Sequence, residues 1–288
     1  MRRLLLARAI ERRKIMDEKA LLARLNELPR IQQVLQELLE MVNKEEVDFG
    51  ALTKKIAMEQ VLSARLLRLA NSAHFGGSRT VASINDAVIR VGSGSVRTMV
   101  VASVLSSAFP KIDTLDLQQY WSDTFEIAII ASKLGAACKL DANSVFTTGI
   151  LHNIGQLMIH TLAPQEALKI RLCVDAGEVE LEAQQQIIHT DANVLGAKLA
   201  KAWKFPDEMA DAIAYSAQPE KAQLSPKLAR VLHFARDIHH QWDILTEKEK
   251  RLFLAEHPDA RVLAISATFA ETIDAVRGKG RELAEQLV

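Results

Sequence analysis

Apolar residues recur every three or four positions along most of this chain, and convincing alternating runs typical of strands are absent. Over 34–42, for example, Val34, Leu35, Leu38 and Val42 would lie on one side of a helix. Hydrophobic residues make up 49% of the 288 residues, aromatic residues only 5%, and glycine occurs 12 times. Small and straight-chain side chains lose little entropy in a helix, so this composition agrees with the spacing. The sequence therefore predicts an all-α protein with a substantial buried core.

Charge and cysteine content narrow the class of protein. Lys+Arg and Asp+Glu are equal at 36 each, so the overall charge gives no sign of a nucleic-acid partner. Residues 1–24 are locally basic and could form a helix on a membrane surface or nucleic acid, but a solvated helix packed on one side is favoured. Cys138 and Cys173 form no disulfide framework and are interpreted as reduced thiols of a cytoplasmic protein. The apolar runs are short and interrupted, so no membrane span is expected.

Capping residues, prolines and glycines divide the chain into helices. Asp48 fits an N-cap, and Ser83 with Asp86 fits a capping box. Gly92-Ser93-Gly94-Ser95 could cradle a phosphate, but no strand precedes it and there is no Lys-Ser/Thr pair, which favours a tight turn between helices. Helices are expected at about 117–138, 143–160, 165–175, 178–188, 192–203 and 206–216, with three or four more over 226–288.

The stretch Gly149-Ile150-Leu151-His152-Asn153-Ile154-Gly155-Gln156-Leu157 resembles the signature of the HD superfamily of metal-dependent phosphohydrolases. Members of that superfamily usually have His-Asp where this chain has His152-Asn153. Several further motifs, in the right order over about residues 22–220, resemble the HDOD family. They are Leu28-Pro29, Leu66-Leu67-Arg68-Leu69-Ala70-Asn71-Ser72-Ala73, Ser83-Ile84-Asn85-Asp86-Ala87-Val88-Ile89, Trp121, Gly196-Ala197-Lys198-Leu199 and Trp203-Lys204-Phe205-Pro206.

The resemblance implies an all-α fold in which an N-terminal helical subdomain packs on a degenerate HD-like bundle. A basic N-terminal helix is expected at 1–24, the HDOD domain at 25–220 and a C-terminal helical extension at 221–288. Within the domain, 25–110 would form the N-terminal subdomain and 111–220 the bundle. The family also implies a role in signal transduction or regulation, commonly without proven catalysis.

HD enzymes gather metal ligands from several helices, and the resemblance gives each ligand a position in this chain. The family pattern is a first His, the His-Asp pair, often a Lys after Ile-Gly, further His residues and a distal Asp. The corresponding positions are, in chain order, Asp123, His152, Asn153, Gln156, Ala192, Ser216, Ala217 and either Arg236 or Asp237. Of the expected histidines only His152 remains in place.

This set offers too few ligands for a hydrolytic metal ion, which needs at least three good protein ligands and an open position for water. Asp123 and His152 could supply two, but Asn153 offers only one neutral oxygen. Arg236 in the distal position would add positive charge where a cation should sit. We interpret Asp123, His152, Asn153, Gln156 and Asp237 as a vestigial polar pocket without a metal or other cofactor. His189 could swing in, but a structural role is favoured.

Two other groups of polar residues have a second interpretation each. His233, His239 and His240 cluster near Asp237; of these, His239-His240 beside Trp242 could form a metal site, but an exposed helix end is favoured. Asp175, Glu178, Glu180 and Glu182 resemble a carboxylate cluster, but on a helix they point to different sides and a solvated surface is favoured.

The sequence thus predicts a non-catalytic regulatory protein that binds a protein partner or ligand in a groove between its two halves. The candidate surface is Asn71, Ser72, His74 and Arg79, because a simple helix end does not need that polarity; an elaborate cap is the other interpretation. The alternative function is a metal-dependent phosphohydrolase acting on a nucleotide or cyclic dinucleotide. A nucleic-acid regulator would rest on the basic N-terminus alone and is not expected.

Overall fold

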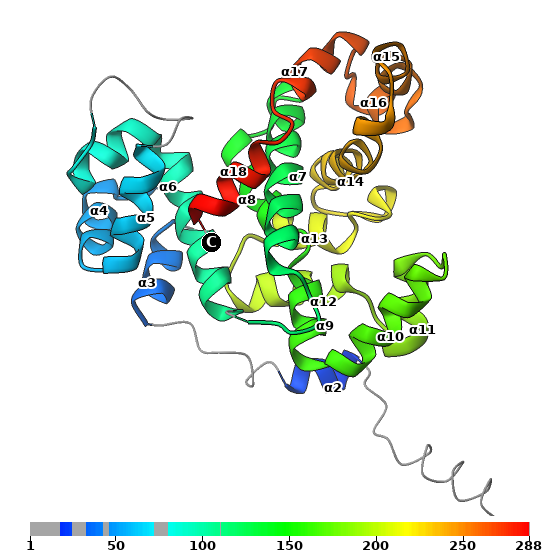
Figure 1. The fold of residues 1–288 in the computed structure, drawn as a ribbon, viewed down its shortest axis with the longest axis horizontal. Helices are drawn as coiled ribbons and strands as arrows, with labels where there is room; N and C mark the ends of the chain where they lie inside the picture. Colours follow the sequence, from blue (N-terminus) through cyan, green and yellow to red (C-terminus); the bar gives the residue numbers. More distant parts are fainter. Residues whose placement is uncertain (1–17, 25–32, 43–45, 72–79, 110, 288) are drawn as a thin grey trace, which may run out of the picture.

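A computed structural model of the chain describes residues 18–24, 33–42, 46–71, 80–109 and 111–287 (Figure 1). Within these residues every regular element is a helix and there is no strand, which confirms the predicted all-α class. The helices form an N-terminal group, a central bundle and a C-terminal group that packs back on both (Figure 1).

The N-terminal group packs around one long helix, α6. Asp48 caps α4 by accepting the N–H of Ala51 at 2.9 Å, and Ser83 caps α6 by accepting the N–H of Asp86 at 3.1 Å. Both N-caps are therefore confirmed, but the reciprocal capping-box bond from the N–H of Ser83 to Asp86 is not among the hydrogen bonds of the described residues. The helices of this part are α2 (Glu18–Ala23), α3 (Gln33–Val42), α4 (Phe49–Ala57), α5 (Gln60–Ala70) and α6 (Ile84–Ala108), of which α2 lies apart, beside the central bundle (Figure 1).

The central bundle carries the HD-like motif. Helix α7 packs on α8, α9 packs on α12, and α12 packs on α13. One apolar core continues from the N-terminal group into this bundle, so the two halves are not separated by a polar boundary. The helices are α7 (Leu117–Ala137), α8 (Ala142–Leu151), α9 (Ile154–Leu162), α10 (Pro164–Asp175), α11 (Glu180–Ile188), α12 (Ala192–Ala202) and α13 (Asp207–Ala214).

The C-terminal group forms a second core together with α7. Trp242 and Phe234 are fully buried in it, and Ile130 of α7 is part of the same cluster. Helix α14 therefore contributes to the bundle although it begins beyond residue 220. The elements are η2 (Pro219–Lys221), α14 (Pro226–Gln241), η3 (Trp242–Ile244), α15 (Glu247–Glu256), α16 (Pro258–Leu263), η4 (Ala267–Phe269), α17 (Ala270–Asp274) and α18 (Lys279–Leu287).

Helix α6 bends sharply at Gly92, whose φ of 78° and ψ of 164° lie outside the helical region. A positive φ suits glycine, so the predicted turn at this glycine-rich segment is confirmed as a kink between two helical halves. By length and composition α6 could cross a membrane, but 56% of its most apolar window is buried inside the protein. Packing in the core accounts for its apolar character.

The helix expected over 143–160 is in fact two helices, which corrects the sequence-based prediction. Helix α8 ends at Leu151 and α9 begins at Ile154, so His152 and Asn153 lie at the junction. The second residue of α9 must be a glycine, Gly155, because a Cβ there would overlap the backbone carbonyl of Ala192, where α12 begins. Most residues over 145–159 are buried, so no change in the spacing of buried positions marks the break.

Helix α18 returns to the middle of the molecule, where it runs along α7 and reaches α5 and α6 (Figure 1). Its start is held by the buried carboxylate of Glu126, which accepts the backbone N–H groups of Gly278 at 2.8 Å and Gly280 at 2.7 Å. The guanidinium of Arg277 lies 3.3 Å from the same carboxylate. This helix therefore forms one wall of the cleft between the N-terminal group and the bundle.

Candidate functional site

His152 is buried at the junction of α8 and α9, with only 3% of its surface exposed. Its Nδ1 lies 2.5 Å from the carbonyl oxygen of Gly149, so Nδ1 carries the proton and donates. Burial, followed by the positive charge of Arg236, lowers the pKa of His152 to about 3. The ring is therefore neutral at physiological pH and is oriented by the end of its own helix.

Asp123 lies on α7 and is engaged by two donors at a single oxygen. Its Oδ1 accepts from Nε2 of Gln119 at 2.8 Å and lies 3.2 Å from Nε2 of His239. Burial raises the pKa of Asp123, but the hydrogen bonds from His239 and Gln119 outweigh it and leave the pKa below its usual range. The other ring nitrogen of His239 lies 3.3 Å from a guanidinium nitrogen of Arg277. His239 thus links Asp123 to the segment that precedes α18.

Arg236 lies near His152, on the same side of α14 as His239. Burial lowers the pKa of Arg236, while the negative charges of Glu180 and Asp237 act in the opposite direction. Among the residues that the structure describes, no hydrogen bond or ion pair to its side chain is formed. A guanidinium cannot lose its proton in a protein, so this position holds a permanent positive charge.

The positions of the missing ligands are closed by helix packing. The backbone N–H of Ala192 donates to Oε1 of Gln184 at 2.8 Å, and Ser216 is buried with its hydroxyl bonded to the carbonyl of Ile213 at 3.1 Å. Both of these polar groups therefore already have a hydrogen-bond partner within the protein. His189, which could have swung in, instead ends α11 in the left-handed region with φ of 54°. It is a helix C-cap, as the structural interpretation predicted.

Three of the predicted residues do share a cavity of about 360 Å³: Asp123, Asn153 and Gln156 line it, whereas His152 and Asp237 do not. Gln156 donates to Glu180, which lines the same cavity. Glu180 is exposed, which agrees with its interpretation as solvated surface, although its carboxylate also lies at the edge of this cavity. Asp237 faces away from the cavity and lies near His233 and His257.

We call Asp123, His152, Asn153, Gln156 and Arg236 the HD-like site. The superfamily implies metal ions there, and these residues do not fit them. One carboxylate is already bound by a histidine, the imidazole is fixed by a carbonyl, Asn153 is neutral, and Arg236 adds a positive charge. A cation would meet repulsion where it needs ligands.

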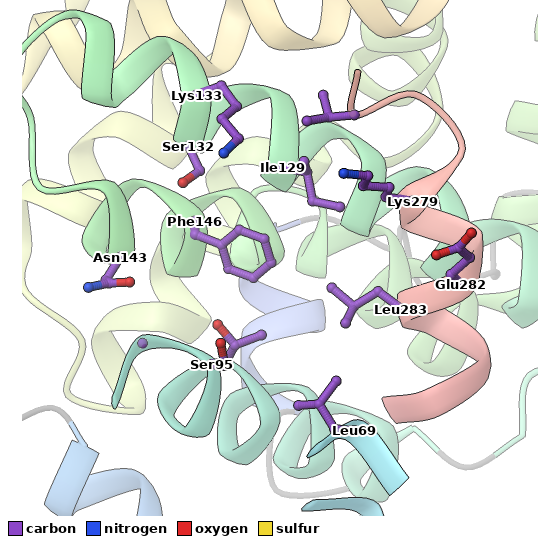
Figure 2. Close-up of a pocket in the computed structure, with 13 residues that line it drawn as sticks. Leu69, Ser95, Ile129, Ser132, Lys133, Asn143, Phe146, Lys279, Glu282 and Leu283 are labelled. Carbon is purple, nitrogen blue, oxygen red and sulfur yellow. The ribbon is translucent and has the colours of Figure 1, made fainter. Parts of the chain in front are cut away.

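A second cavity, of about 320 Å³, lies in the cleft between the two halves (Figure 2). Phe146, Ile129 and Leu283 give it apolar walls, and Lys133 and Lys279 lie along one side. Neither ammonium group has an ion-pair partner in the described residues. We call this space the cleft cavity. It confirms that a groove exists between the halves, but its lining differs from the surface expected from sequence.

Asn71, from that expected surface, has a structural role. Its side-chain amide pairs with both backbone groups of Val81, through Nδ2 to the carbonyl at 2.8 Å and Oδ1 to the N–H at 2.8 Å. It also donates to the carbonyl of Leu67 at 2.9 Å. These bonds support the elaborate-cap interpretation for Asn71. Ser72, His74 and Arg79 lie outside the described residues.

Sequence reasoning missed His239 and Lys279 as site residues. His239 was expected at an exposed helix end, yet its side chain is largely buried against Asp123. The i, i+3 spacing of Arg236 and His239 was the available signal that both face the bundle. Lys279 reaches the cleft cavity only because α18 folds back across the molecule, and no local pattern predicts that contact.

A family model of the HDOD domain matches residues 28–219. The crystal structure of a candidate phosphohydrolase from Shewanella amazonensis SB2B is 35% identical, with a TM-score of 0.83, covering 96% of this chain and 100% of that one. A candidate signal transduction protein from Marinobacter aquaeolei VT8 is 20% identical, with a TM-score of 0.76, covering 99% of this chain and 65% of that one.

One curated protein, an uncharacterized protein from Treponema pallidum (strain Nichols), is 24% identical over 204 residues. The aligned part is 67% of this chain but only 38% of that protein's length.

Proposed function

The chain belongs to the HDOD domain family, and on this premise we propose that it is a regulatory protein that acts by binding rather than by hydrolysis. The observation that supports this most directly is the charge of Arg236 acting on the buried, neutral His152. In an HD enzyme this is the place where a metal ion would be held. A fixed guanidinium brings a permanent positive charge to this place, and it cannot coordinate or activate water.

Binding is proposed to occur in the cleft cavity. Its volume of about 320 Å³ lies in the range of small-molecule sites, and its walls belong to both halves and to α18. Thr98 is only 7% exposed, lines the cavity and makes no side-chain hydrogen bond among the described residues. This hydroxyl and the two ammonium groups without ion pairs lie beside apolar walls, with Glu282 as the one acidic lining residue among those described. The excess of donors suits an occupant with an acidic group and an apolar part. That occupant is proposed to be a ligand, or a side chain of a protein partner.

The catalytic part of the proposal is tested by hydrolysis assays with manganese and three substrates, bis(p-nitrophenyl) phosphate, ATP and cyclic di-GMP. We expect turnover no greater than that of the Asn153→Ala variant. Metal-dependent turnover that is lost in both Asn153→Ala and Asp123→Ala, with folding intact, would overturn the proposal.

The binding part is tested by affinity capture from native lysate, followed by rebinding of the purified partner or ligand. The Lys133→Glu, Lys279→Glu double variant should lose most of the capture. Lys248→Glu on α15 is the matched control, because Lys248 is exposed and does not line the cleft cavity. Equal capture by all three proteins, with coincident melting curves, would exclude the cleft cavity as the binding site.

The alternative, a phosphohydrolase, is supported by the 35% identical Shewanella protein and by the cavity that Asp123 and Asn153 line. The same hydrolysis assays decide between the two, since the alternative requires turnover that depends on Asp123 and Asn153.

A further inference from the structure

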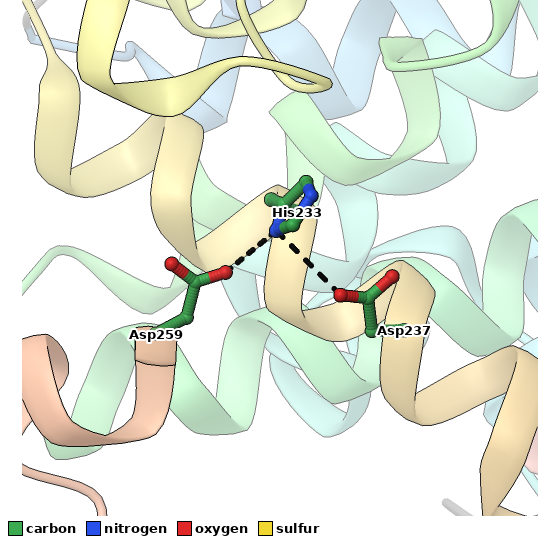
Figure 3. A group of neighbouring side chains, drawn as sticks. All are labelled: His233, Asp237 and Asp259. Carbon is green, nitrogen blue, oxygen red and sulfur yellow. Dashed lines mark hydrogen bonds and ion pairs between the residues drawn. The ribbon is translucent and has the colours of Figure 1, made fainter. Parts of the chain in front are cut away.

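Outside the HD-like site, α14 and the start of α16 bring three candidate metal ligands together (Figure 3). Nδ1 of His233 lies 2.6 Å from Oδ2 of Asp259 and 3.6 Å from Oδ2 of Asp237. One ligand atom from each residue lies within 4.8 Å of the others. We call these three residues the His-Asp cluster.

The fold positions the cluster from two separate segments. His233 and Asp237 are four residues apart on α14, so they lie on one side of that helix. Asp259 follows Pro258 at the start of α16 and is buried, with 3% of its surface exposed. The side chains of His233 and Asp237 are about one-third exposed, so solvent reaches the cluster from the α14 side.

The cluster is distinct from the HD-like site. Arg236 and His239 lie on the neighbouring side of α14, and Asp237 does not line the cavity of Asp123, Asn153 and Gln156. No carboxylate of the cluster contacts Asp123 or Asn153 among the interactions of the described residues. A cation bound at the cluster would therefore use none of the family's ligand positions apart from Asp237, whose side chain points away from them.

The spacing of the ligand atoms suits a small cation. In a tetrahedral zinc site with bonds of about 2.0 Å, neighbouring ligand atoms are about 3.3 Å apart. The distances of 2.6 and 3.6 Å from His233 bracket that value, so small rotations of the side chains would reach it. One imidazole and two carboxylates leave the fourth position to water, as in sites with three protein ligands.

Neighbouring groups fix the orientation of both carboxylates. Arg230 donates to the second oxygen of Asp259 at 2.5 Å, which leaves Oδ2 directed toward His233. Nδ1 of His257 accepts the N–H of Asp259 at 3.2 Å, so its Nε2 carries the proton and donates to Asp237 at 3.1 Å. Such supporting hydrogen bonds are a common feature of metal sites, where they hold ligands in place.

We propose that His233, Asp237 and Asp259 bind one divalent transition-metal ion, with zinc preferred because the ligands are one imidazole and two carboxylates. The site stands independently of the proposed regulatory function, since it shares no residue with the cleft cavity. On binding, the ion displaces the proton through which Nδ1 of His233 is hydrogen-bonded to Asp259, and that proton is released to solvent. The two carboxylates balance the charge of the ion, and Arg230 remains bound to the outer oxygen of Asp259.

The test uses the full chain, stripped with EDTA and dialysed, then titrated with zinc chloride in a calorimeter. We expect about one equivalent to bind, and His233→Ala to weaken binding by at least about tenfold. Asp259→Asn, which keeps the shape of the side chain, should do the same. His240→Ala is the matched control, because it removes an exposed histidine of the same helix that lies outside the cluster.

Cobalt substitution provides a second readout, since a tetrahedral cobalt site absorbs strongly in the visible range and nonspecific surface binding does not. Circular dichroism of each variant shows whether the fold is intact. The proposal is overturned if the stripped protein binds no zinc, if His233→Ala binds as tightly as the parent, or if His240→Ala alone abolishes binding.

Discussion

Two neighbouring sides of helix α14 carry the same kinds of residue and have opposite chemical character. On one side Arg236 and His239 face the bundle, where His152 is neutral and Asp123 is already engaged. On the other side His233 and Asp237 face Asp259, whose second oxygen is held by Arg230. The first arrangement places a cationic side chain where a metal would lie, and the second directs carboxylates at a single imidazole. The difference shows that residue types in a sequence do not identify a metal site until their charges are placed in space.

The largest expected effect on stability comes from removing Asp259, which binds both His233 and Arg230. Asp259→Ala should lower the free energy of unfolding by about 3–5 kcal/mol, because Arg230 would remain partly buried without its partner. Asp123→Ala should cost less than about 1 kcal/mol, since its side chain is well exposed and forms a single ion pair. Urea denaturation of both variants measures the contrast. Equal losses would mean that the two sides of α14 are energetically alike.

The next largest effect is a pH dependence of stability, which comes from His152 in the bundle. His152 has a folded pKa of about 3, below the ordinary value of 6.5. The unfolded chain therefore binds a proton first as the pH falls, and stability that is present above the unfolded pKa is lost. Between about pH 7 and pH 5 this loss should reach about 2 kcal/mol.

The variant His152→Gln tests this, because glutamine keeps a hydrogen-bond donor and does not titrate. Its urea midpoint should fall less than that of the parent over the same pH interval. If both proteins lose stability equally, another group is responsible and His152 is not held neutral by its surroundings.

A smaller effect separates the two arginines of α14. Arg236 has no hydrogen-bond partner in the described part of the chain, so Arg236→Met should raise the free energy of unfolding by about 1 kcal/mol. Arg230→Met should lower it, because Asp259 would lose a donor at 2.5 Å. Thermal melts of the pair provide the measurement. A destabilised Arg236→Met would reveal a structural contribution that the contacts of Arg236 do not explain.

The smallest expected effect is on metal content at the HD-like site. Asn153→Asp restores the family's carboxylate, yet it should add no further equivalent of manganese or zinc to the parent value. The charge of Arg236 remains, and Ala192, Ser216 and Ala217 still lack ligating groups. Elemental analysis after dialysis checks this, and a gain of two equivalents would show that a single carboxamide had disabled the site.

Features that depend on local chemistry could be predicted from the sequence. The caps at Asp48 and Ser83 and the kink at Gly92 depend on a few adjacent residues, and each is found where it was expected. The all-α class followed from spacing that persists along the chain. The break at His152 could not be predicted, because most residues over 145–159 are buried and the spacing of buried positions does not change at the break.

The chemistry of the sites was predictable only where a motif fixed it. His152 and Asn153 were identified from the HD-like motif, and the assignment of Arg236 or Asp237 to the distal position stays a prediction. The pairing of His239 with Asp123, and of His233 with Asp259, joins residues from different helices. Spacing along the chain contains no information about such pairs. The position of α18 was missed for the same reason.

The contact between Glu126 and the start of α18 can form only late in the synthesis of the chain. Glu126 and Gly278 are 152 residues apart in the chain, so a ribosome completes α7 long before the backbone groups that satisfy Glu126 exist. Until α18 has been synthesised, the carboxylate of Glu126 must stay hydrated. The cleft also lacks the wall that α18 forms. Contacts between such distant residues form late because a long loop must close first. Nascent chains arrested before residue 278 should therefore expose α7 to protease along the surface that α18 later covers.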